Sequence, residues 1–370
     1  MSFREENKKI AAIVLAAGLS SRMGTFKPLL PVGNDIAILR SINNLNKSGV
    51  RDIIIVTGQL NFKDRVNMPT NVSFAHNPDY KDGMFSSVLT GVKALADDLD
   101  GFFVLPADCC AVSSDELGLL IDELRDCVVI PSFAGRRGHP PLFPIRCAKD
   151  ILTYEGGDGL KGIRNEMPKT EIKMPTAGTI LDMDTPEDYA LLLSFLGIPT
   201  YPSKDESIEI LKKHNASDEI IEHGKHVAKV ALYIAKLINE KGAEINTGLL
   251  EASCLLHDLV RFRPNHAELA KQLLLEMGYP DAAIVVGKHM DIDGPCNKIN
   301  EALLLYLADK LCRRGQLVPL DKTLREMGKK FPTESEAYRH AEIRMSNAKA
   351  IASLLQHQYR ISYEDISRYC

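Results

Sequence analysis

A short apolar stretch that runs into a glycine-punctuated loop constrains this chain more than any other feature. Residues 13–17 are apolar, which is typical of a strand buried on both faces of a parallel sheet. Gly18 and Gly24 punctuate the loop that follows, and Arg22 and Lys27 add two positive charges. A backbone that passes close to a polyphosphate needs glycine for its missing Cβ, and fixed positive charge to neutralise the phosphates. The stretch therefore predicts a phosphate-binding loop.

The composition is that of an ordinary globular protein with room for two or three domains. Its 370 residues are 45% hydrophobic and 25% charged. The net charge of −4 and the pI near 6.2 do not indicate nucleic acid as a partner. The eight cysteines are scattered, without a C-x-x-C pair or a secretory leader, so we expect a cytoplasmic protein. The apolar runs are shorter than the ~20 residues of a membrane helix, so we expect no membrane partner.

The first half of the chain alternates strands and helices. Apolar spacing predicts a helix over residues 35–47 and a buried strand over residues 52–57. Strand, helix and strand in this order indicate right-handed βαβ winding and a mostly parallel sheet. Further strands are predicted at residues 72–74 and 101–105, with a helix over residues 86–96 between them. We expect an α/β, Rossmann-like domain.

Two aspartates are candidate metal ligands in this half. Asp108 follows the predicted strand at residues 101–105, and ligands of α/β sheets bind beyond the carboxyl ends of strands. One or two carboxylates suit Mg²⁺, which otherwise keeps water and substrate phosphates. The alternative role for Asp108 is to cap the helix that begins near Ser114. Asp184 precedes another helix start, and is either a second metal carboxylate or a turn former. We favour the metal for both.

The loop and five later blocks resemble a known family of nucleotidyltransferases. The loop lacks the order of a P-loop or of a dinucleotide-binding fold. It matches G-x-S-x-R-M-G-x-x-K, at Gly18, Ser20, Arg22, Met23, Gly24 and Lys27. This pattern resembles the nucleotide-binding signature of the molybdenum cofactor nucleotidyltransferases and their sugar and isoprenoid relatives. The later blocks resemble the cytidylyltransferase branch over residues 9–197: Asn77-Pro78, Gly83 with Ser86-Ser87, residues 138–143, Gly157-Asp158-Gly159 and residues 184–188.

The resemblance implies a role for individual residues. In that family the loop holds the triphosphate, an aspartate holds Mg²⁺, and the Gly-His-Pro segment lies near the pterin acceptor. This implies that Arg22, Lys27 and Asp108 are catalytic, that Asp108 binds Mg²⁺ and that His139 contacts the acceptor. It also implies an NTP, a molybdopterin-type acceptor and contact with molybdoenzymes. The implied nucleotide-binding residues are Ala16, Ala17, Gly18, Ser20, Arg22, Gly24 and Lys27.

The opening Ala16-Ala17-Gly18 looks more like the CTP-using branch than the guanylyl branch with its paired glycines. We therefore expect transfer of CMP from CTP with release of pyrophosphate. One departure is visible, because the family usually has proline two places after the metal aspartate, where this chain has Cys110. That departure concerns the loop geometry rather than the carboxylate. The alternative acceptor is a phosphosugar or phosphocholine, since the triphosphate loop is shared while acceptor pockets differ.

The pattern changes after residue 197. A glycine and two prolines in residues 197–204 indicate a boundary, so we expect a domain over residues 1–197, a linker over 198–204 and a second domain over 205–370. No strand is predicted beyond the linker. Apolar spacing predicts an all-α domain, with helices over residues 218–241, 249–260, 302–311 and 335–356.

Ionisable residues on these apolar helices predict a second site. The pair His257-Asp258 lies in an apolar segment, where burying charge is costly unless a metal compensates it. The ordered set resembles the H…HD…D ligands of the HD-domain metal-dependent phosphohydrolases, and two further histidines lie where two-metal members have them. His226 is a competing first ligand, but the family's histidine precedes the helix valine by four residues. The implied metal ligands are His223, His257, Asp258, His266, His289 and Asp309.

Imidazole and carboxylate ligands suit Mn²⁺, Fe²⁺, Co²⁺ or Zn²⁺ better than Mg²⁺ alone, and the resemblance implies one or two such ions. Water acidified by two metals would attack a phosphoester. The two motif sets together predict a bifunctional enzyme, a nucleotidyltransferase joined to a phosphohydrolase. The alternative for the second half is a regulatory sensor that binds metal without turnover.

Overall fold

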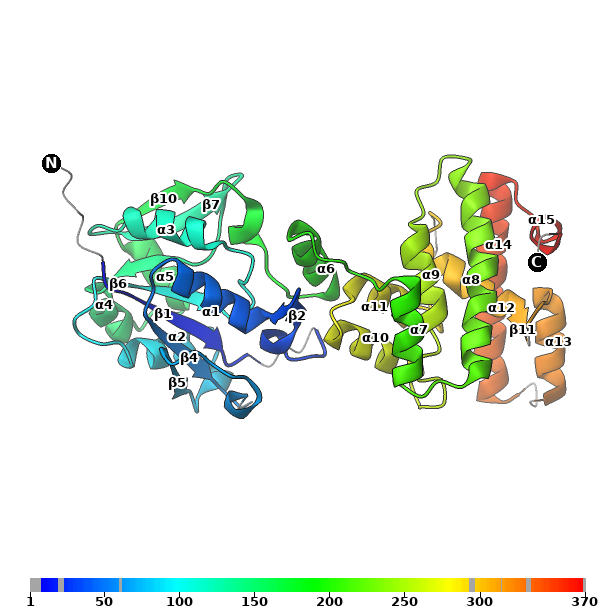
Figure 1. Cartoon of the computed structure of the whole chain (residues 1–370), viewed down its shortest axis with the longest axis horizontal. Helices are drawn as coiled ribbons and strands as arrows, with labels where there is room; N and C mark the ends of the chain where they lie inside the picture. The colour runs from blue at the N-terminus through cyan, green and yellow to red at the C-terminus, as the bar shows by residue number, and fades with distance from the viewer. Residues whose placement is uncertain are drawn as a thin grey trace. The chain divides into compact units, whose positions relative to one another are not determined.

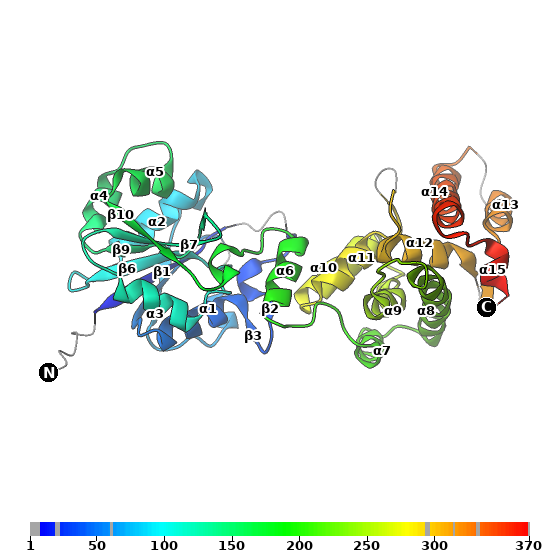
Figure 2. The ribbon, with the colours of Figure 1, turned by 90° about the horizontal axis from the view of Figure 1, so that it is seen from above.

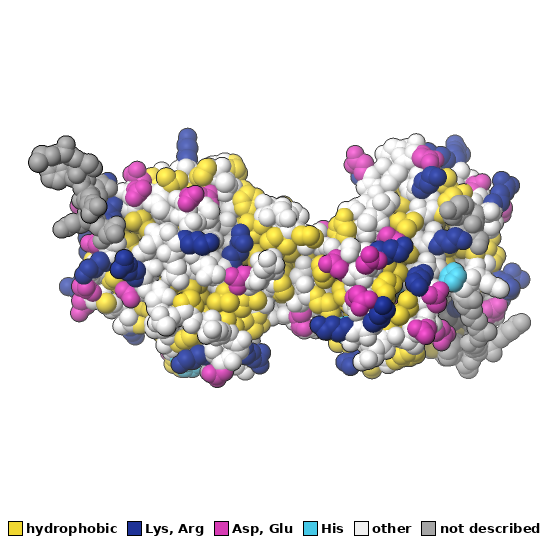
Figure 3. Space-filling model, viewed as in Figure 1, with side chains coloured by type: hydrophobic (Ala, Val, Ile, Leu, Met, Phe, Trp, Pro, Cys, Tyr) yellow, Lys and Arg dark blue, Asp and Glu magenta, His cyan; other side chains and the backbone are white. Residues whose placement is uncertain are grey.

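The computed structural model describes residues 8–18, 23–59, 62–292, 297–313, 315–330 and 334–368. The chain packs into two compact units, Met1–Ile198 and Pro199–Cys370. Figure 1 shows strands and helices together in the first unit and mainly helices in the second. Of the helices in the described ranges, none combines the length and apolar character needed to cross a membrane. On the face seen in Figure 3, cationic and anionic side chains are interspersed rather than separated by sign.

A sheet forms the centre of the first unit. In the described part of the chain it has eight strands, in the order β10-β7-β9-β6-β1-β4-β5, with β8 paired to β7. The central strand β1 runs parallel to both of its neighbours, β4 and β6, whereas β9 and β8 are antiparallel to theirs. This confirms the predicted α/β fold with a mostly parallel sheet. The strands are β1 (Ile10–Ala16), β4 (Asp52–Thr57), β5 (Val72–His76), β6 (Gly101–Pro106), β7 (Val128–Phe133), β8 (Arg136–Arg137), β9 (Leu142–Pro144) and β10 (Lys169–Lys173).

Helices cover both faces of the sheet, which is why β1 is apolar at every position (Figure 2). Val14 and its alternate neighbours face a core shared with α1 (Ala37–Lys47) and α3 (Ser114–Asp122). Ile13 and its alternate neighbours face a second core. That core includes side chains of α2 (Met84–Lys93), α4 (Cys147–Thr153) and α5 (Gly159–Glu166).

Two predicted helices of this unit differ at their ends. The helix expected from residue 35 begins at Ala37, because Asp35–Ile36 (β3) pairs with Pro31–Val32 (β2) in a small antiparallel ladder. The helix expected over residues 86–96 is α2, which begins at Met84 and ends at Lys93. Thr185 caps α6 (Pro186–Phe195) as predicted, since its Oγ1 accepts from the Asp188 backbone N–H at 3.1 Å.

The second unit is built from helices. They are α7 (Lys204–Lys213), α8 (Asp218–Asn239), α9 (Thr247–Leu256), α10 (His266–Glu276), α11 (Pro280–Gly287), α12 (Glu301–Leu311), α13 (Leu320–Lys330), α14 (Glu336–Tyr359) and α15 (Tyr363–Ser367). The expectation of no strands was wrong in one place. Cys312–Arg313 (β11) and Gln316–Leu317 (β12) form a short hairpin, in which Gly315 takes a φ of 73° at the turn. The helix predicted over residues 249–260 ends at Leu256, where His257 and Asp258 enter a turn.

Close packing of α2 on the central strand predicts a stability effect. A Cβ added at Gly91 would lie 2.3 Å from Ile13 Cγ2, in the core between α2 and β1. Gly91→Ala should therefore lower the free energy of unfolding by about 1–3 kcal/mol through overpacking. Urea denaturation followed by circular dichroism measures this change.

The matched control is Gly118→Ala in α3, where an added Cβ meets nothing within 4 Å. That variant should keep or raise stability, by up to about 1 kcal/mol, because alanine favours helix. Equal stability of the two variants would contradict the packing assignment.

Candidate functional site

One lysine joins two aspartates at the edge of the first unit's sheet. Lys27 begins a 3₁₀ turn (Lys27–Leu29), Asp108 follows β6, and Asp184 precedes α6. Lys27 Nζ lies 3.1 Å from Asp108 Oδ2 and 2.5 Å from Asp184 Oδ1. Burial lowers the pKa of Lys27, but the hydrogen bond to Asp184 and the charge of Asp108 outweigh it and raise the pKa. The fold thus brings together three predicted site residues that are far apart in the sequence.

A third carboxylate, which the sequence analysis did not single out, lies beside this group. Burial raises the pKa of Asp182, and the negative charges of Asp184 and Asp108 raise it further. The signal was present in the order Leu181-Asp182-Met183-Asp184, where fully buried Met183 separates two acidic residues. Alternation in an extended segment places both carboxylates on the side away from the core. A divalent cation bound here would relieve the repulsion between these carboxylates.

The rest of the predicted phosphate loop is described in part. Ala16 and Ala17 are buried at the end of β1, and Gly18 is exposed just beyond them. Gly24 is exposed and has a φ of 68°. Two predicted contacts, Ser20 and Arg22, lie outside the described residues.

The residues that follow Asp108 are buried, including the cysteine that stands where the related family usually has proline. Cys110 is fully buried, and its carbonyl oxygen accepts a hydrogen bond from Arg40 Nε at 3.2 Å. Burial raises the pKa of the Cys110 thiol to about 12, so it is not a nucleophile near neutral pH. Cys110 is therefore a packing residue, while Asp108 keeps its contact with Lys27.

His139 lies on a segment that is held from both sides. Its backbone N–H donates to Thr179 O at 2.8 Å, and Thr179 Oγ1 donates to His139 O at 2.6 Å. Burial lowers the pKa of His139, and the charge of Arg164 lowers it further. His139 Nδ1 and Arg164 Nε are both buried, and neither has a hydrogen-bond partner among the described residues. Such nitrogens could serve a bound ligand, and the Asp108 charge also acts on His139.

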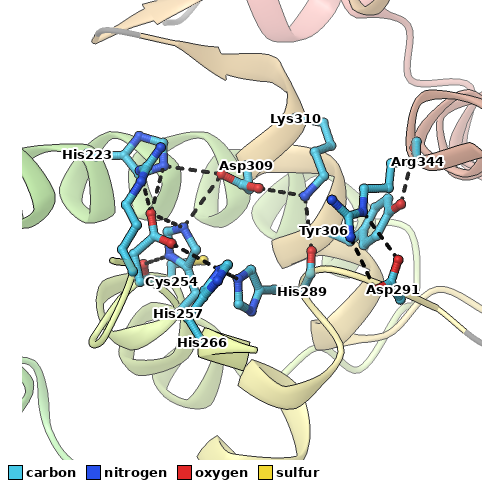
Figure 4. A network of polar contacts seen from close by, with 12 residues as sticks. His223, Cys254, His257, His266, His289, Asp291, Tyr306, Asp309, Lys310 and Arg344 are labelled. Atoms are coloured by element: carbon cyan, nitrogen blue, oxygen red, sulfur yellow. Dashed lines mark hydrogen bonds and ion pairs between the residues drawn. The ribbon is translucent and has the colours of Figure 1, made fainter. Parts of the chain in front are cut away.

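The second unit gathers all six predicted metal ligands in one cluster (Figure 4). His223 Nε2, from α8, lies 3.1 Å from Asp309 Oδ1, from α12. His257 Nε2 lies 3.4 Å from Asp258 Oδ2 and 3.5 Å from Asp309 Oδ1. His266 Nε2 and His289 Nε2 lie 3.1 Å apart, at the start of α10 and after α11.

Asp258 belongs to two groups with the spacing of metal ligands. One contains His223 and His257, and the other contains His266 and His289. The ligand atoms of each group lie within 4.8 Å of one another. This arrangement suits two cations that share one carboxylate. The competing candidate His226 is not part of either group, and its Nδ1 instead contacts Glu222 O at 2.8 Å.

Backbone carbonyls orient two of the imidazoles. His257 Nδ1 lies 2.8 Å from Cys254 O, and His289 Nδ1 lies 2.7 Å from Val286 O. A carbonyl can only accept, so each Nδ1 carries the proton and each Nε2 offers its lone pair to the cluster in the neutral ring. His257 Nε2 is buried and faces the Asp258 and Asp309 carboxylates at 3.4 and 3.5 Å. These are the features of a histidine prepared for a metal.

Close helix packing places these ligands. A Cβ at Gly224 would lie 3.0 Å from Leu255 O, so α8 approaches α9 closely beside His223. Since α9 ends at Leu256, His257 and Asp258 enter the cluster from the turn that follows.

Two cations that the sequence analysis did not single out hold the carboxylates. Arg261 Nη1 lies 2.6 Å from Asp258 Oδ2, and Lys310 Nζ lies 2.7 Å from Asp309 Oδ2. Lys310 also donates to His289 O at 3.0 Å and lies over the Tyr306 ring. Adjacency to a ligand in the sequence was the available signal for Lys310.

Without a metal, protons compensate the negative charge. Burial lowers the pKa of His257, but Asp258 and Asp309 outweigh it and raise the pKa to about 10. Burial lowers the pKa of His289 to about 3, and the nearby charge of His257 contributes to this. A cation bound here would therefore displace a proton from His257, which couples metal binding to proton release.

Comparisons with known proteins match both halves of the chain. Residues 12–170 match the MobA-like NTP transferase domain, and residues 220–314 match the HD domain. The molybdenum cofactor cytidylyltransferase of Escherichia coli (strain K12) is 30% identical over 182 residues, which are 49% of this chain and 93% of that protein. Purine catabolism protein PucB of Bacillus subtilis (strain 168) is 26% identical over 196 residues, which are 50% of this chain and 95% of that protein.

Among solved structures, Rv0371c from Mycobacterium tuberculosis H37Rv is 23% identical, with a TM-score of 0.46 over 51% of this chain and 100% of that chain. The domain matches confirm the two family resemblances seen in the sequence.

The shared carboxylate predicts how metal content responds to substitution. His223→Ala and His266→Ala should each remove one of two bound ions, because each histidine belongs to one group. Asp258→Asn should weaken both. Elemental analysis of the full-length variants, after loading with Mn²⁺ and desalting, measures the stoichiometry. His226→Ala is the control on the same helix, and equal metal loss in that variant would contradict the assignment of His223.

Proposed function

We propose two activities for this chain, which belongs to the MobA-like NTP transferase family and also carries an HD hydrolase domain. The first is the transfer of CMP from CTP to a molybdopterin-type acceptor. The second is the hydrolysis of a phosphoester. The observation that carries the first activity is the contact of Lys27 with both Asp108 and Asp184 beside the glycine loop. The observation that carries the second is the cluster of six histidine and aspartate ligands.

The first activity is a substitution at phosphorus. An oxygen of the acceptor phosphate attacks the α-phosphorus of the nucleotide. The bond from that phosphorus to the oxygen bridging to the β-phosphate breaks, and pyrophosphate leaves with the bonding electrons. Lys27 holds its positive charge because its pKa is raised, and it stabilises the negative charge that develops on the phosphates. Asp108 and Asp184 would hold Mg²⁺, which supplies charge neutralisation and orients the phosphates.

The choice of base and acceptor rests on three supports. The Escherichia coli relative is named a molybdenum cofactor cytidylyltransferase, and 93% of its length aligns with this chain. The Ala16-Ala17 opening agrees with that branch. His139 and Arg164, each with a buried nitrogen that lacks a partner in the described part of the chain, provide polar groups for an acceptor near Asp108. Molybdoenzymes are then the expected recipients of the product.

The second activity depends on the buried cluster. His223, His257, Asp258 and Asp309 would hold one divalent cation, while His266 and His289 would hold another with Asp258. Such ions supply Lewis-acid polarisation of a phosphoryl oxygen and lower the pKa of water. The chain's own residues keep the imidazole lone pairs directed inward, through Cys254 O and Val286 O. Arg261 and Lys310 add positive charge where phosphoryl oxygens gain negative charge.

The first proposal is tested by pyrophosphate release with molybdopterin and each of the four NTPs. Release should be fastest with CTP, and Lys27→Ala or Asp108→Ala should lower it by about 100-fold or more, since transition-state charge loses its stabilisation. Lys9→Ala is the control, because Lys9 forms an exposed pair with Asp98 at 2.7 Å. Unchanged release in both site variants would reject the assignment. Release with a phosphosugar or phosphocholine but not with molybdopterin would favour the other acceptor class.

The second proposal predicts that the two activities separate. Asp309→Asn should lower hydrolysis of bis(p-nitrophenyl) phosphate and p-nitrophenyl phosphate by about 100-fold while leaving pyrophosphate release unchanged. Lys27→Ala should have the opposite effect. The measurement is both assays on the same preparations, with His226→Ala as the control. Stoichiometric metal with no hydrolysis of any phosphoester would instead identify a sensor.

A further inference from the structure

The turn between Asp258 and His266 carries a large hydrophobic side chain that nothing in the described residues covers. Phe262 is 83% exposed, and the next most exposed large hydrophobic residue in the described ranges, Met84, is 63% exposed. Single exposed apolar residues are common on protein surfaces. This one, however, lies in the short segment that joins two residues of the metal-ligand cluster. Its exposure alone would need no explanation, but its position beside the cluster does.

The turn has a defined shape. The backbone N–H of Arg261 donates to Asp258 O at 3.1 Å, which closes a tight turn directly after the shared carboxylate. Asn265 has a φ of 52°, in the left-handed region that residues other than glycine rarely adopt. It immediately precedes His266, and the chain therefore turns back sharply. Asp258 Oδ1 and His266 Nε2 consequently lie only 3.8 Å apart.

Phe262 is flanked by two arginines, one of which reaches the cluster. Arg261 Nη1 lies 2.6 Å from Asp258 Oδ2, and Phe262 is one Cα step of about 3.8 Å further along the chain. Arg263 is exposed on the other side. Aromatic side chains beside positive charge are the combination that binds nucleotides, because the ring stacks on a base while the cations attract phosphate.

We propose that Phe262 is a specificity residue that stacks on the base of a nucleotide whose phosphate lies at the His/Asp cluster. This inference rests on the proposed phosphohydrolase function and adds to it a preference for phosphoesters that carry an aromatic base over those that do not. Every nucleobase offers a flat face, so stacking distinguishes nucleotides from sugar phosphates without selecting one base. Arg261 stays near the phosphate, and Phe262 binds the far end of the same molecule.

The composition of the chain makes a direct test possible. The protein contains no tryptophan, so Phe262→Trp places a single fluorescent reporter in the turn. In the full-length, Mn²⁺-loaded variant, AMP, GMP, CMP and UMP should each quench the emission saturably, and ribose 5-phosphate should not. Ile343→Trp is the matched control, because Ile343 is 56% exposed on α14 and lies outside the turn. Its emission should not respond.

Steady-state kinetics provide the second measurement. Phe262→Ala should raise KM for hydrolysed nucleotides by about tenfold, the effect of losing one stacking contact. It should leave kcat and the KM for ribose 5-phosphate unchanged, and Phe262→Tyr should restore the nucleotide KM. Metal content equal to that of the unsubstituted protein checks that each variant keeps the cluster intact.

The outcomes separate this inference from the proposed function. No response of the Phe262→Trp variant to any nucleotide, or an equal response to ribose 5-phosphate, overturns the stacking role. Saturable quenching without hydrolysis of any nucleotide supports the stacking site and rejects the phosphohydrolase. Hydrolysis of nucleotides and ribose 5-phosphate with equal KM rejects the stacking role and supports the phosphohydrolase.

Discussion

Both sites of this protein hold carboxylates close together at the edges of apolar elements, and this crowding of like charge is the constraint on which the surrounding structure depends. In the first unit, Asp108 and Asp184 share one lysine, and burial together with their charges raises the pKa of Asp182. In the second, Asp258 is buried and Asp309 is partly buried among imidazoles and two cations. Such groupings are costly in a low-dielectric interior unless opposite charge compensates them. Rigid, well-packed frames are needed to keep them together.

The two frames provide that rigidity in different ways. In the α/β unit, β1 is buried along its whole length, and helices cover both faces of the sheet. The loop after β1 and the aspartate after β6 then meet at one edge, as expected for adjacent parallel strands. In the helical unit, the predicted ligands come from α8, α10, α12 and two turns. There the backbone carbonyls of Cys254 and Val286 fix the direction of the imidazoles.

The donor sets also explain how one chain can carry two different phosphate chemistries. The first site offers carboxylate oxygens and an ammonium group, which suit Mg²⁺ and the charge of a triphosphate. The second offers four imidazole nitrogens with two carboxylates, which suit transition metals and activation of water. The cysteines within the described ranges take no part in either set. Cys110 is a buried thiol with a raised pKa, and Cys254 contributes its carbonyl oxygen rather than its sulfur.

The sequence by itself determined which residue types were available and in what order, because ligand motifs and apolar periodicity are local properties. The mostly parallel sheet and the helical second half were predictable from apolar periodicity, and the six clustered histidines and aspartates from the resemblance to the HD-domain family. Only the tertiary structure decided what surrounds those residues. Lys27 contacts Asp108 and Asp184, and His223 contacts Asp309, only because folding brings distant segments together. The end of α9 at Leu256 likewise depends on the turn that holds His257. Distances between charges, and hence their pKa values, arise only when separate segments pack together.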